Sequence, residues 1–275
     1  MELQELREEI KKTDEDISKL FVKRMELAAQ IAEYKKEHGL AIEDPDQEAR
    51  VISERSPLVE DEVLRGYYVQ FLKDTMYVSK RWQHRLMFGQ KIAFCPAEDD
   101  TATAAVESLF PDAAAVDYPN YDEAYAAVVN GECDAAVLPF ELSYGGEVGR
   151  VLDLMFEGDL YVNEVLNYKN GDSTIRYAVL SRANNKAPYK GNASAFMIMF
   201  TVKDETGGLA KAINLVSAYN FNMRALRSRP MADLPWHYYF YAEVEGDDTT
   251  DNGKRMMNAL KVACPMVKVV GRYKI

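Results

Sequence analysis

Two cations and two neutral polar side chains in the first ninety residues have the spacing of a small binding site. Arg24 and Lys35 lie eleven positions apart, about three helical turns, so on a helix they share one face to within about 20°. Ser79 and Gln83 lie four positions apart and also share a helix face, although their neighbours are apolar. Together with Glu48, these residues could clamp a dicarboxylate, with the cations on the carboxylates and the neutral groups supplying hydrogen bonds.

A plainer interpretation is available for each pair. A single Lys or Arg beside an apolar stripe more often lies at the surface, with its aliphatic stem on the stripe and its charge in water. A Ser and a Gln one turn apart can hydrogen-bond along the helix surface. The residue types alone therefore leave two readings open, a dicarboxylate clamp and an ordinary solvated helix face.

Long helices must position these side chains. Apolar residues recur at helical spacing over about thirty-five residues from the amino terminus, which predicts one helix that ends near Gly39. Asp44 before Pro45 predicts the start of a second helix, over 45–55, and a third is predicted over 60–87. A helix of roughly 50 Å cannot bury its apolar stripe against two shorter helices alone. We therefore expect it to pair with a copy of itself in a homodimer.

The rest of the chain alternates strands and helices. Four strands are predicted at 91–95, 113–118, 133–141 and 174–181. A helix is predicted between the first and second strands and another between the second and third. This alternation indicates an open α/β sheet. After a polar, turn-rich stretch at 181–194, the order strand–helix–strand–strand–helix–strand is typical of a ferredoxin-like α+β fold. We therefore predict three domains: an all-helical domain, a single α/β lobe with its linker, and an α+β tail, at 1–90, 91–190 and 191–275.

Composition limits the classes of partner. The 275 residues have a formal net charge of −11 and a pI near 4.9, which disfavours nucleic acid and anionic membranes as partners. The three scattered cysteines predict a reducing compartment without disulfides, and the three dispersed histidines do not suggest a metal site. The charged amino terminus is unlike a secretion signal, and no apolar run has membrane-spanning length. We expect a cytoplasmic protein.

The helical segment resembles the all-helical class of chorismate mutase over residues 1 to about 88. The resemblance runs through LREEIKKTDEDISKLFVKRMELAAQIAEYKK, EDPDQEARV and YVQFLKDTMYVSKRWQ. It implies an intertwined homodimer that converts chorismate to prephenate without cofactor or metal. This [3,3] rearrangement needs no nucleophile and no proton transfer. Catalysis would come from holding the compact conformer and from fixed dipoles at the oxygen that gains negative charge.

The same resemblance assigns roles to individual residues. The partner subunit's Arg7 and the chain's own Arg24 would each bind a substrate carboxylate, and Lys35 and Gln83 would face the ether oxygen of the breaking bond. Ser79 would help to hold a carboxylate. Glu48, together with the backbone near Asp44, would hold the ring hydroxyl.

One position departs from the mutase pattern. The family usually reads Arg-Glu where this chain reads Gln47-Glu48, so a cation that flanks the substrate site is missing. Arg50, one turn along, is the candidate substitute.

The middle segment resembles prephenate dehydratase, through DAAVLPFELSYGGEV and STIRYAVL. Leu142 stands where the family has Asn, and Ile175 where it has the dehydratase threonine, with Thr174 displaced by one position. Residues 95–100, CPAEDD, replace the Gly-Pro-x-Gly-Thr turn, and nearly a whole second lobe is absent. We therefore expect the dehydratase chemistry to be lost and the remnant to pack the tail against the mutase dimer.

The tail resembles an ACT domain of the phenylalanine-sensing kind, through TGGLAKAI and LRSRPMADLPWHYYFY. It implies phenylalanine or tyrosine as an effector, bound by the glycine turn and the following strand at Gly207, Gly208, Leu209, Ser228, Arg229 and Pro230. Arg227 replaces an expected Glu beside this site. A glycine pair that only closes a tight turn is the alternative. The alternating Trp236, Tyr238 and Phe240 are expected to be core residues rather than ligand contacts.

The sequence thus predicts an enzyme, a cofactor-free dimeric chorismate mutase of phenylalanine and tyrosine biosynthesis with an amino-acid-sensing tail. One alternative is a bifunctional mutase–dehydratase that keeps both activities. Another is a non-catalytic amino-acid sensor whose mutase site has decayed at Gln47. The presence of Arg7, Arg24 and Lys35 together argues against the sensor.

Overall fold

The computed structural model describes residues 2–97, 100–184, 194–231 and 234–275, and it divides into two compact units, Met1–Gln90 and Lys91–Ile275. None of the described helices combines the length and apolar character needed to span a membrane.

The first unit is entirely helical, as predicted. Its elements are α1 (Leu3–Glu37), α2 (Pro45–Arg55), a single 3₁₀ turn η1 (Ser56–Leu58) and α3 (Glu62–Phe88). The side chain of Asp44 caps α2 by accepting a 3.0 Å hydrogen bond from the Gln47 amide, and Pro45 occupies the first helical turn. Asp61 caps α3 in the same way, by accepting from the Leu64 amide at 2.8 Å.

The apolar stripe of α1 stays uncovered within one copy of this unit. Only Ala28 and Ala32 of this helix are buried. Large apolar side chains along the helix are exposed, among them Leu3, Leu6, Ile10, Ile17, Leu20, Phe21, Leu27 and Ile31. The predicted helix is confirmed, and the second copy that would cover its stripe remains a prediction.

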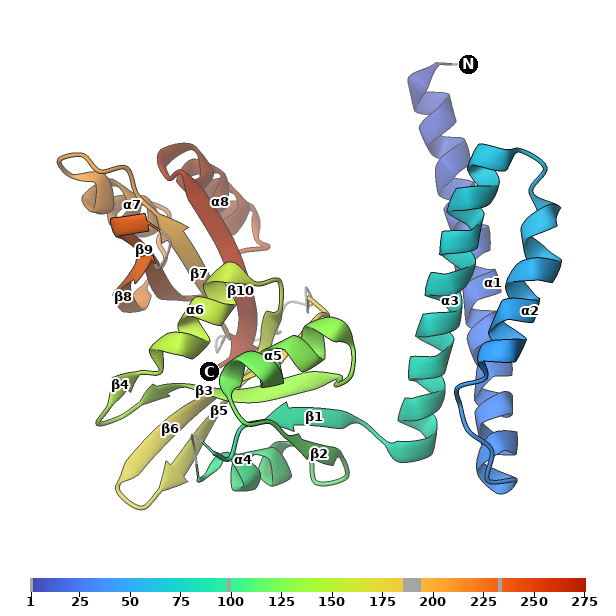
Figure 1. The fold of residues 1–275 in the computed structure, drawn as a ribbon. Helices are drawn as coiled ribbons and strands as arrows, with labels where there is room; N and C mark the ends of the chain where they lie inside the picture. The colour runs from blue at the N-terminus through green and yellow to red at the C-terminus, as the bar shows by residue number, and fades with distance from the viewer. Residues whose placement is uncertain (1, 98–99, 185–193, 232–233) are drawn as a thin grey trace. The chain divides into compact units, whose positions relative to one another are not determined.

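The second unit is built on one continuous sheet (Figure 1). Its lobe elements are β1 (Lys91–Phe94), α4 (Ala102–Leu109), β2 (Ala114–Asp117), α5 (Tyr121–Asn130), β3 (Ala135–Leu142), β4 (Gly146–Glu147), α6 (Gly149–Glu157), β5 (Tyr161–Asn170) and β6 (Ser173–Ser181). Its tail elements are β7 (Ser194–Thr201), α7 (Gly208–Ala218), β8 (Met223–Met231), β9 (Leu234–Glu245), α8 (Asp251–Ala263) and β10 (Met266–Lys274). The tail has the predicted βαββαβ order, whereas α6 and β5 are additions to the elements expected from sequence.

The strand order β2-β1-β3-β6-β5-β10-β7-β9-β8 joins lobe and tail through β5 and β10, which run parallel and pair at Val162 and Gly271. A Cβ on Gly271 would lie 2.1 Å from the Val162 carbonyl oxygen, so glycine permits this close approach. The predicted division near residue 190 therefore falls inside a shared sheet, and the linker residues 185–193 lie outside the described part of the chain.

Two cores bury the two faces of the tail sheet. One face packs on α7 and α8 through residues such as Phe196, Ile198 and Leu260. The other contributes Tyr239 and Tyr241 to a core that also holds lobe residues. Lobe and tail therefore share one hydrophobic core, which places the tail's second face against the lobe rather than in water.

The expectation that three alternating aromatics of β9 are core is wrong at its outer end. Trp236 is 90% exposed, with a positive φ of 65°, and Tyr238 is 45% exposed, whereas Phe240 is partly buried. The buried aromatics lie on the other face, at Tyr239 and Tyr241. The strand has two packed faces, so alternation alone did not identify which face is deeper.

Candidate functional sites

In the helical unit, α1 and α3 bring Arg24 to the inward-facing serine. The Arg24 guanidinium Nη1 donates to the Thr75 carbonyl oxygen at 3.2 Å and to the Ser79 hydroxyl oxygen. Ser79 is only 5% exposed, and burial lowers the pKa of Arg24. Among the described residues, no carboxylate lies within salt-bridge distance of this guanidinium. Arg24 is thus a partly buried cation that hydrogen-bonds neutral oxygens, and such a cation can bind an anion.

One turn further along α3, Gln83 is also buried, at 7% exposed. Its Oε1 atom has no hydrogen-bond partner among the described residues. Leaving a buried amide end unpaired costs about 1–3 kcal/mol, so a ligand that pairs with it gains that amount. Since the two ends of an amide exchange by a half rotation, the unpaired end can present either the oxygen or the NH₂ donor.

Lys35 and Glu48 lie at the end of the unit where the chain turns from α1 into α2. The Lys35 ammonium donates to the Ile42 carbonyl oxygen at 2.7 Å, which leaves further N–H donors on the same nitrogen. Glu48, on α2, accepts from the Lys80 ammonium of α3 at 2.8 Å. Glu43, just before α2, accepts from His84 Nε2 at 2.9 Å, and this hydrogen bond lowers the pKa of Glu43.

Other predicted site residues have different surroundings. Arg7 is exposed and lies seventeen positions before Arg24, about 25 Å along α1, so it cannot meet that site in the same subunit. Gln47 is exposed, and Asp44 uses its carboxylate as the α2 cap. Arg50 pairs with Glu54 at 3.2 Å, with both side chains more than half exposed.

A cavity of about 390 Å³ in this unit lies elsewhere on α1 and α3. None of the predicted site residues lines it. Its lining residues are Ala29, Gln30, Ala32, Glu33, Lys36, Leu86 and Met87.

In the lobe, carboxylates of the protein balance the charge of the arginine on the dehydratase-like strand. Arg176 on β6 donates to the Glu243 carboxylate at 2.5 and 2.9 Å and to Glu141 at 2.6 Å. Burial acts to lower the pKa of Arg176, but the hydrogen bonds and charge of Glu243 and Glu141 raise it overall. Glu243, 1% exposed on tail strand β9, also accepts from the hydroxyls of Tyr241 and Tyr273.

The two residues that replace polar dehydratase positions face each other. Leu142 of β3 and Ile175 of β6 are cross-strand partners, and both pack in the apolar cluster under the sheet. Between β5 and β6 only Gly171 and Asp172 form the turn, with a φ of 58° at the glycine. Of the divergent turn CPAEDD, Glu98 and Asp99 lie outside the described residues.

Arg227, which reverses the expected charge beside the tail's ligand turn, reaches the lobe instead. Its guanidinium lies 2.8 Å from Glu147 of β4 and 3.4 Å from Glu141 of β3. The two arginines therefore share Glu141, and together with Glu243 they tie lobe to tail through an ion network.

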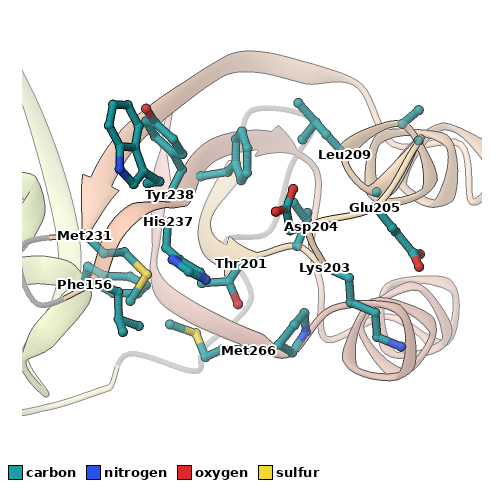
Figure 2. A pocket seen from close by; sticks show the side chains of 18 residues that line it. Phe156, Thr201, Lys203, Asp204, Glu205, Leu209, Met231, His237, Tyr238 and Met266 are labelled. Carbon is teal, nitrogen blue, oxygen red and sulfur yellow. The ribbon is translucent and has the colours of Figure 1, made fainter.

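The tail holds a cavity of about 630 Å³ beside its glycine turn. Gly207, Gly208 and Leu209, all predicted ligand residues, line it. Figure 2 shows Asp204 and Leu209 on one side of this cavity and Phe156, Met231 and His237 on the other. The exposed Trp236 and Tyr238 line it as well, a contact that the alternation pattern in the sequence did not reveal.

Ser228, Arg229 and Pro230 do not line this cavity. The Nε and Nη2 atoms of Arg229 each donate to the Asp153 carboxylate of α6 at 2.8 Å, and the Tyr239 hydroxyl donates to the same carboxylate at 2.6 Å. This strand segment therefore serves the lobe–tail contact in the structure.

The sequence matches two family models in succession. Chorismate mutase type II matches residues 6–84, and prephenate dehydratase matches residues 96–183. The bifunctional chorismate mutase/prephenate dehydratase of Aquifex aeolicus (strain VF5) is 22% identical over 361 aligned positions, which cover 99% of this chain and 98% of that protein. The chain belongs to the bifunctional chorismate mutase/prephenate dehydratase family. The alignment has 361 positions against 275 residues, so at least 86 positions of the Aquifex protein have no counterpart here.

Two solved structures share the fold of the second unit. GqqA, described as a novel type of quorum quenching acylase, has a TM-score of 0.60 at 23% identity, over 67% of this chain and 95% of that chain. The prephenate dehydratase from Arthrobacter aurescens, solved in complex with L-Phe, has a TM-score of 0.58 at 16% identity, over 67% and 90%. At these identities, the likeness concerns the fold alone.

Proposed function

We propose that the helical unit converts chorismate to prephenate, and that Arg24 carries the binding of the substrate. The observation behind this assignment is the partly buried Arg24 guanidinium, whose hydrogen-bond partners among the described residues are neutral oxygens, so that its charge is available for a substrate carboxylate. Ser79, buried against the same guanidinium, would help to hold that carboxylate.

The buried amide of Gln83 and the ammonium of Lys35 would act on the breaking bond. As the bond between carbon and the ether oxygen breaks, that oxygen gains negative charge, and two fixed donors stabilise it more in the transition state than in the ground state. Lys35 is already oriented by the Ile42 carbonyl, and the Oε1 end of Gln83 has no competing partner in the described part of the chain. Glu48 would accept the hydrogen bond of the ring hydroxyl.

The active form would be a homodimer. One copy leaves the α1 stripe exposed, and Arg7 stands about 25 Å from Arg24 on a single helix. A second α1 along this stripe would bury the apolar residues and bring the partner subunit's Arg7 to the second carboxylate. Cytoplasmic localisation is part of the same proposal.

The lobe would lack dehydratase activity. Arg176 is occupied by Glu243 and Glu141, and an apolar pair replaces two polar positions. At least 86 positions of the Aquifex relative are missing. The alternative, a protein with both activities, draws support from the match of residues 96–183 to prephenate dehydratase and from the names of the relatives.

The tail would bind phenylalanine or tyrosine in the 630 Å³ cavity. The amides at the start of α7 suit a carboxylate, Asp204 suits an ammonium group, and Phe156, Met231 and Met266 suit an aromatic ring. The Arthrobacter aurescens prephenate dehydratase was solved in complex with L-Phe.

One coupled assay tests these proposals together. Purified protein is given chorismate, and chorismate, prephenate and phenylpyruvate are followed by absorbance and chromatography, with and without each aromatic amino acid. We expect loss of chorismate and accumulation of prephenate. Phenylpyruvate formed from added prephenate would establish the bifunctional alternative. An unchanged chorismate signal, with amino-acid binding still present in calorimetry, would establish the sensor.

A further inference from the structure

The ion pair between Lys80 and Glu48 lies inside the proposed mutase site, although Lys80 has no assigned role. The Lys80 Nζ atom lies 2.8 Å from Glu48 Oε1, and the two side chains are 28% and 31% exposed. The pair joins α3 to α2 at a point flanked on α3 by Ser79 and Gln83. A lysine in this position contacts the carboxylate that would hold the ring hydroxyl of chorismate.

One oxygen of that carboxylate has no donor among the residues that the structure describes. Lys80 donates to Oε1, and an ionised carboxylate can accept hydrogen bonds at both oxygens. The ammonium therefore restrains the side-chain torsions of Glu48 and leaves Oε2 able to accept from a hydroxyl group. One turn along α3, His84 engages Glu43 in a parallel contact, so the same face of α3 holds two carboxylates of the segment that begins α2.

Other cations nearby do not perform this task. Arg50 is engaged by Glu54 on an exposed face, and position 47 is an exposed, uncharged glutamine. Lys35 is directed to the Ile42 carbonyl. Among the described residues, Lys80 is the cation that contacts Glu48.

We propose that Lys80 is a positioning residue of the mutase: its ammonium holds Glu48 in the orientation that presents Oε2 to the substrate hydroxyl, in a site that has no cation at position 47. This inference rests on the proposed mutase function. It predicts that Lys80 acts on the rate through Glu48 and contributes little to folding, because a partly exposed ion pair stabilises a protein only slightly.

The test is a double-mutant cycle on the full-length protein, with Lys80→Met, Glu48→Gln and the combined variant. We expect Lys80→Met to lower kcat about tenfold to a hundredfold, as misorientation of one catalytic contact does, with Tm within about 5 °C of wild type. In the Glu48→Gln background the same change should have little further effect, since the positioned group is already altered. Lys80→Arg, which keeps the charge, should restore most of the rate.

Lys73→Met is the matched control, because Lys73 is exposed on α3 two turns before Lys80, and it should leave kcat and KM unchanged. A Lys80→Met variant with wild-type kcat, or effects of Lys80→Met and Glu48→Gln that multiply, would overturn the role of Lys80 while mutase activity stands. Wild-type protein that leaves chorismate unchanged would overturn the mutase function itself, and the Lys80 proposal with it.

Discussion

The helical unit and the lobe differ in how their buried polar and charged groups are paired. Among the described residues, the Arg24 guanidinium has no carboxylate partner, and the Oε1 atom of Gln83 has no hydrogen-bond partner. In the lobe, Arg176 donates hydrogen bonds to two carboxylates, and Glu243 accepts hydrogen bonds from one arginine and two tyrosines. Since an unpaired buried group costs free energy unless a ligand pairs with it, the first pattern is typical of a binding site and the second of a structural joint.

Replacing Glu243 should break the joint with the largest effect on stability. Glu243→Gln removes one of the two negative charges that face Arg176 and leaves Glu141 as the carboxylate beside this largely buried cation. We expect a loss of about 3–5 kcal/mol in the free energy of unfolding of the second unit, measured by chemical denaturation. Glu245→Gln on the same strand, whose side chain is 44% exposed, should cost about 1 kcal/mol or less.

The same variant also separates the two regions by function. Turnover of chorismate at a temperature where Glu243→Gln remains folded should match wild type, because the joint lies outside the mutase unit. Gain of dehydratase activity is not expected, since Leu142 and Ile175 still replace polar groups. Phenylpyruvate produced by Glu243→Gln would show that Arg176 is a masked catalytic group.

Replacing Lys35 tests the helical side of the comparison. Lys35→Ala removes a donor from the ether oxygen and should raise the barrier by about 2.7–4 kcal/mol, which lowers kcat about a hundredfold to a thousandfold. The dimer should remain folded by circular dichroism and sedimentation. The adjacent exposed Lys36→Ala is the control, and near wild-type turnover by Lys35→Ala would mean that the site is misplaced.

The carboxylates that join lobe and tail, Asp153 and Glu243, should make the stability of the second unit depend on pH. Burial acts to raise the pKa of Asp153, but hydrogen bonds from Arg229 and Tyr239 keep it below its ordinary value of 3.8. Burial likewise acts to raise the pKa of Glu243, which Arg176 and the tyrosines keep below 4.5. Carboxylates with lowered folded-state pKa stabilise the protein above their ordinary pKa and lose this contribution as pH falls through the lowered value.

This sign gives a measurable difference between variants. Asp153→Asn should destabilise the second unit by about 1.5–3 kcal/mol at pH 7, the range for a hydrogen bond to a charged group. The gap in unfolding free energy between wild type and Asp153→Asn should then narrow as pH falls below the ordinary pKa of 3.8, because Asp153 takes up its proton in the unfolded state before it does so in the folded state. Denaturation curves at pH 7 and pH 3 measure it, and a constant gap would contradict the linkage.

Local patterns in the sequence predicted the parts of the fold that depend on neighbouring residues. Asp44 and Pro45 marked the start of α2, and the helical spacing of apolar residues predicted α1. Arg24 and Ser79 are 55 positions apart, so only the packing of α1 on α3 brings them together. The helix α6 was missed because Val148 precedes it without a side-chain cap. Strand β5 was missed because its asparagines and lysine are unfavourable in strands.

The contacts that define the joint could not be found in the same way. Arg176 and Glu243 are 67 positions apart, and Arg227 and Glu141 are 86 apart, so only the folded sheet brings them together. Lys80 was not among the residues singled out from the sequence. Ion pairs between distant segments have no periodic signature in a sequence, which is why the resemblance named candidate substrate contacts but not their partners within the protein.

The tail cavity allows the smallest of these tests. Asp204→Asn removes the carboxylate proposed to pair with an amino-acid ammonium, and we expect phenylalanine to bind about tenfold more weakly, near the lower limit for a hydrogen bond to a charged group. Ser228→Ala changes a residue expected from sequence to bind the ligand but placed outside the cavity, so its affinity should stay at the wild-type value. Isothermal titration with phenylalanine and tyrosine measures both variants. Weakened binding by Ser228→Ala with unchanged binding by Asp204→Asn would move the ligand from the cavity to the strand that carries Arg229.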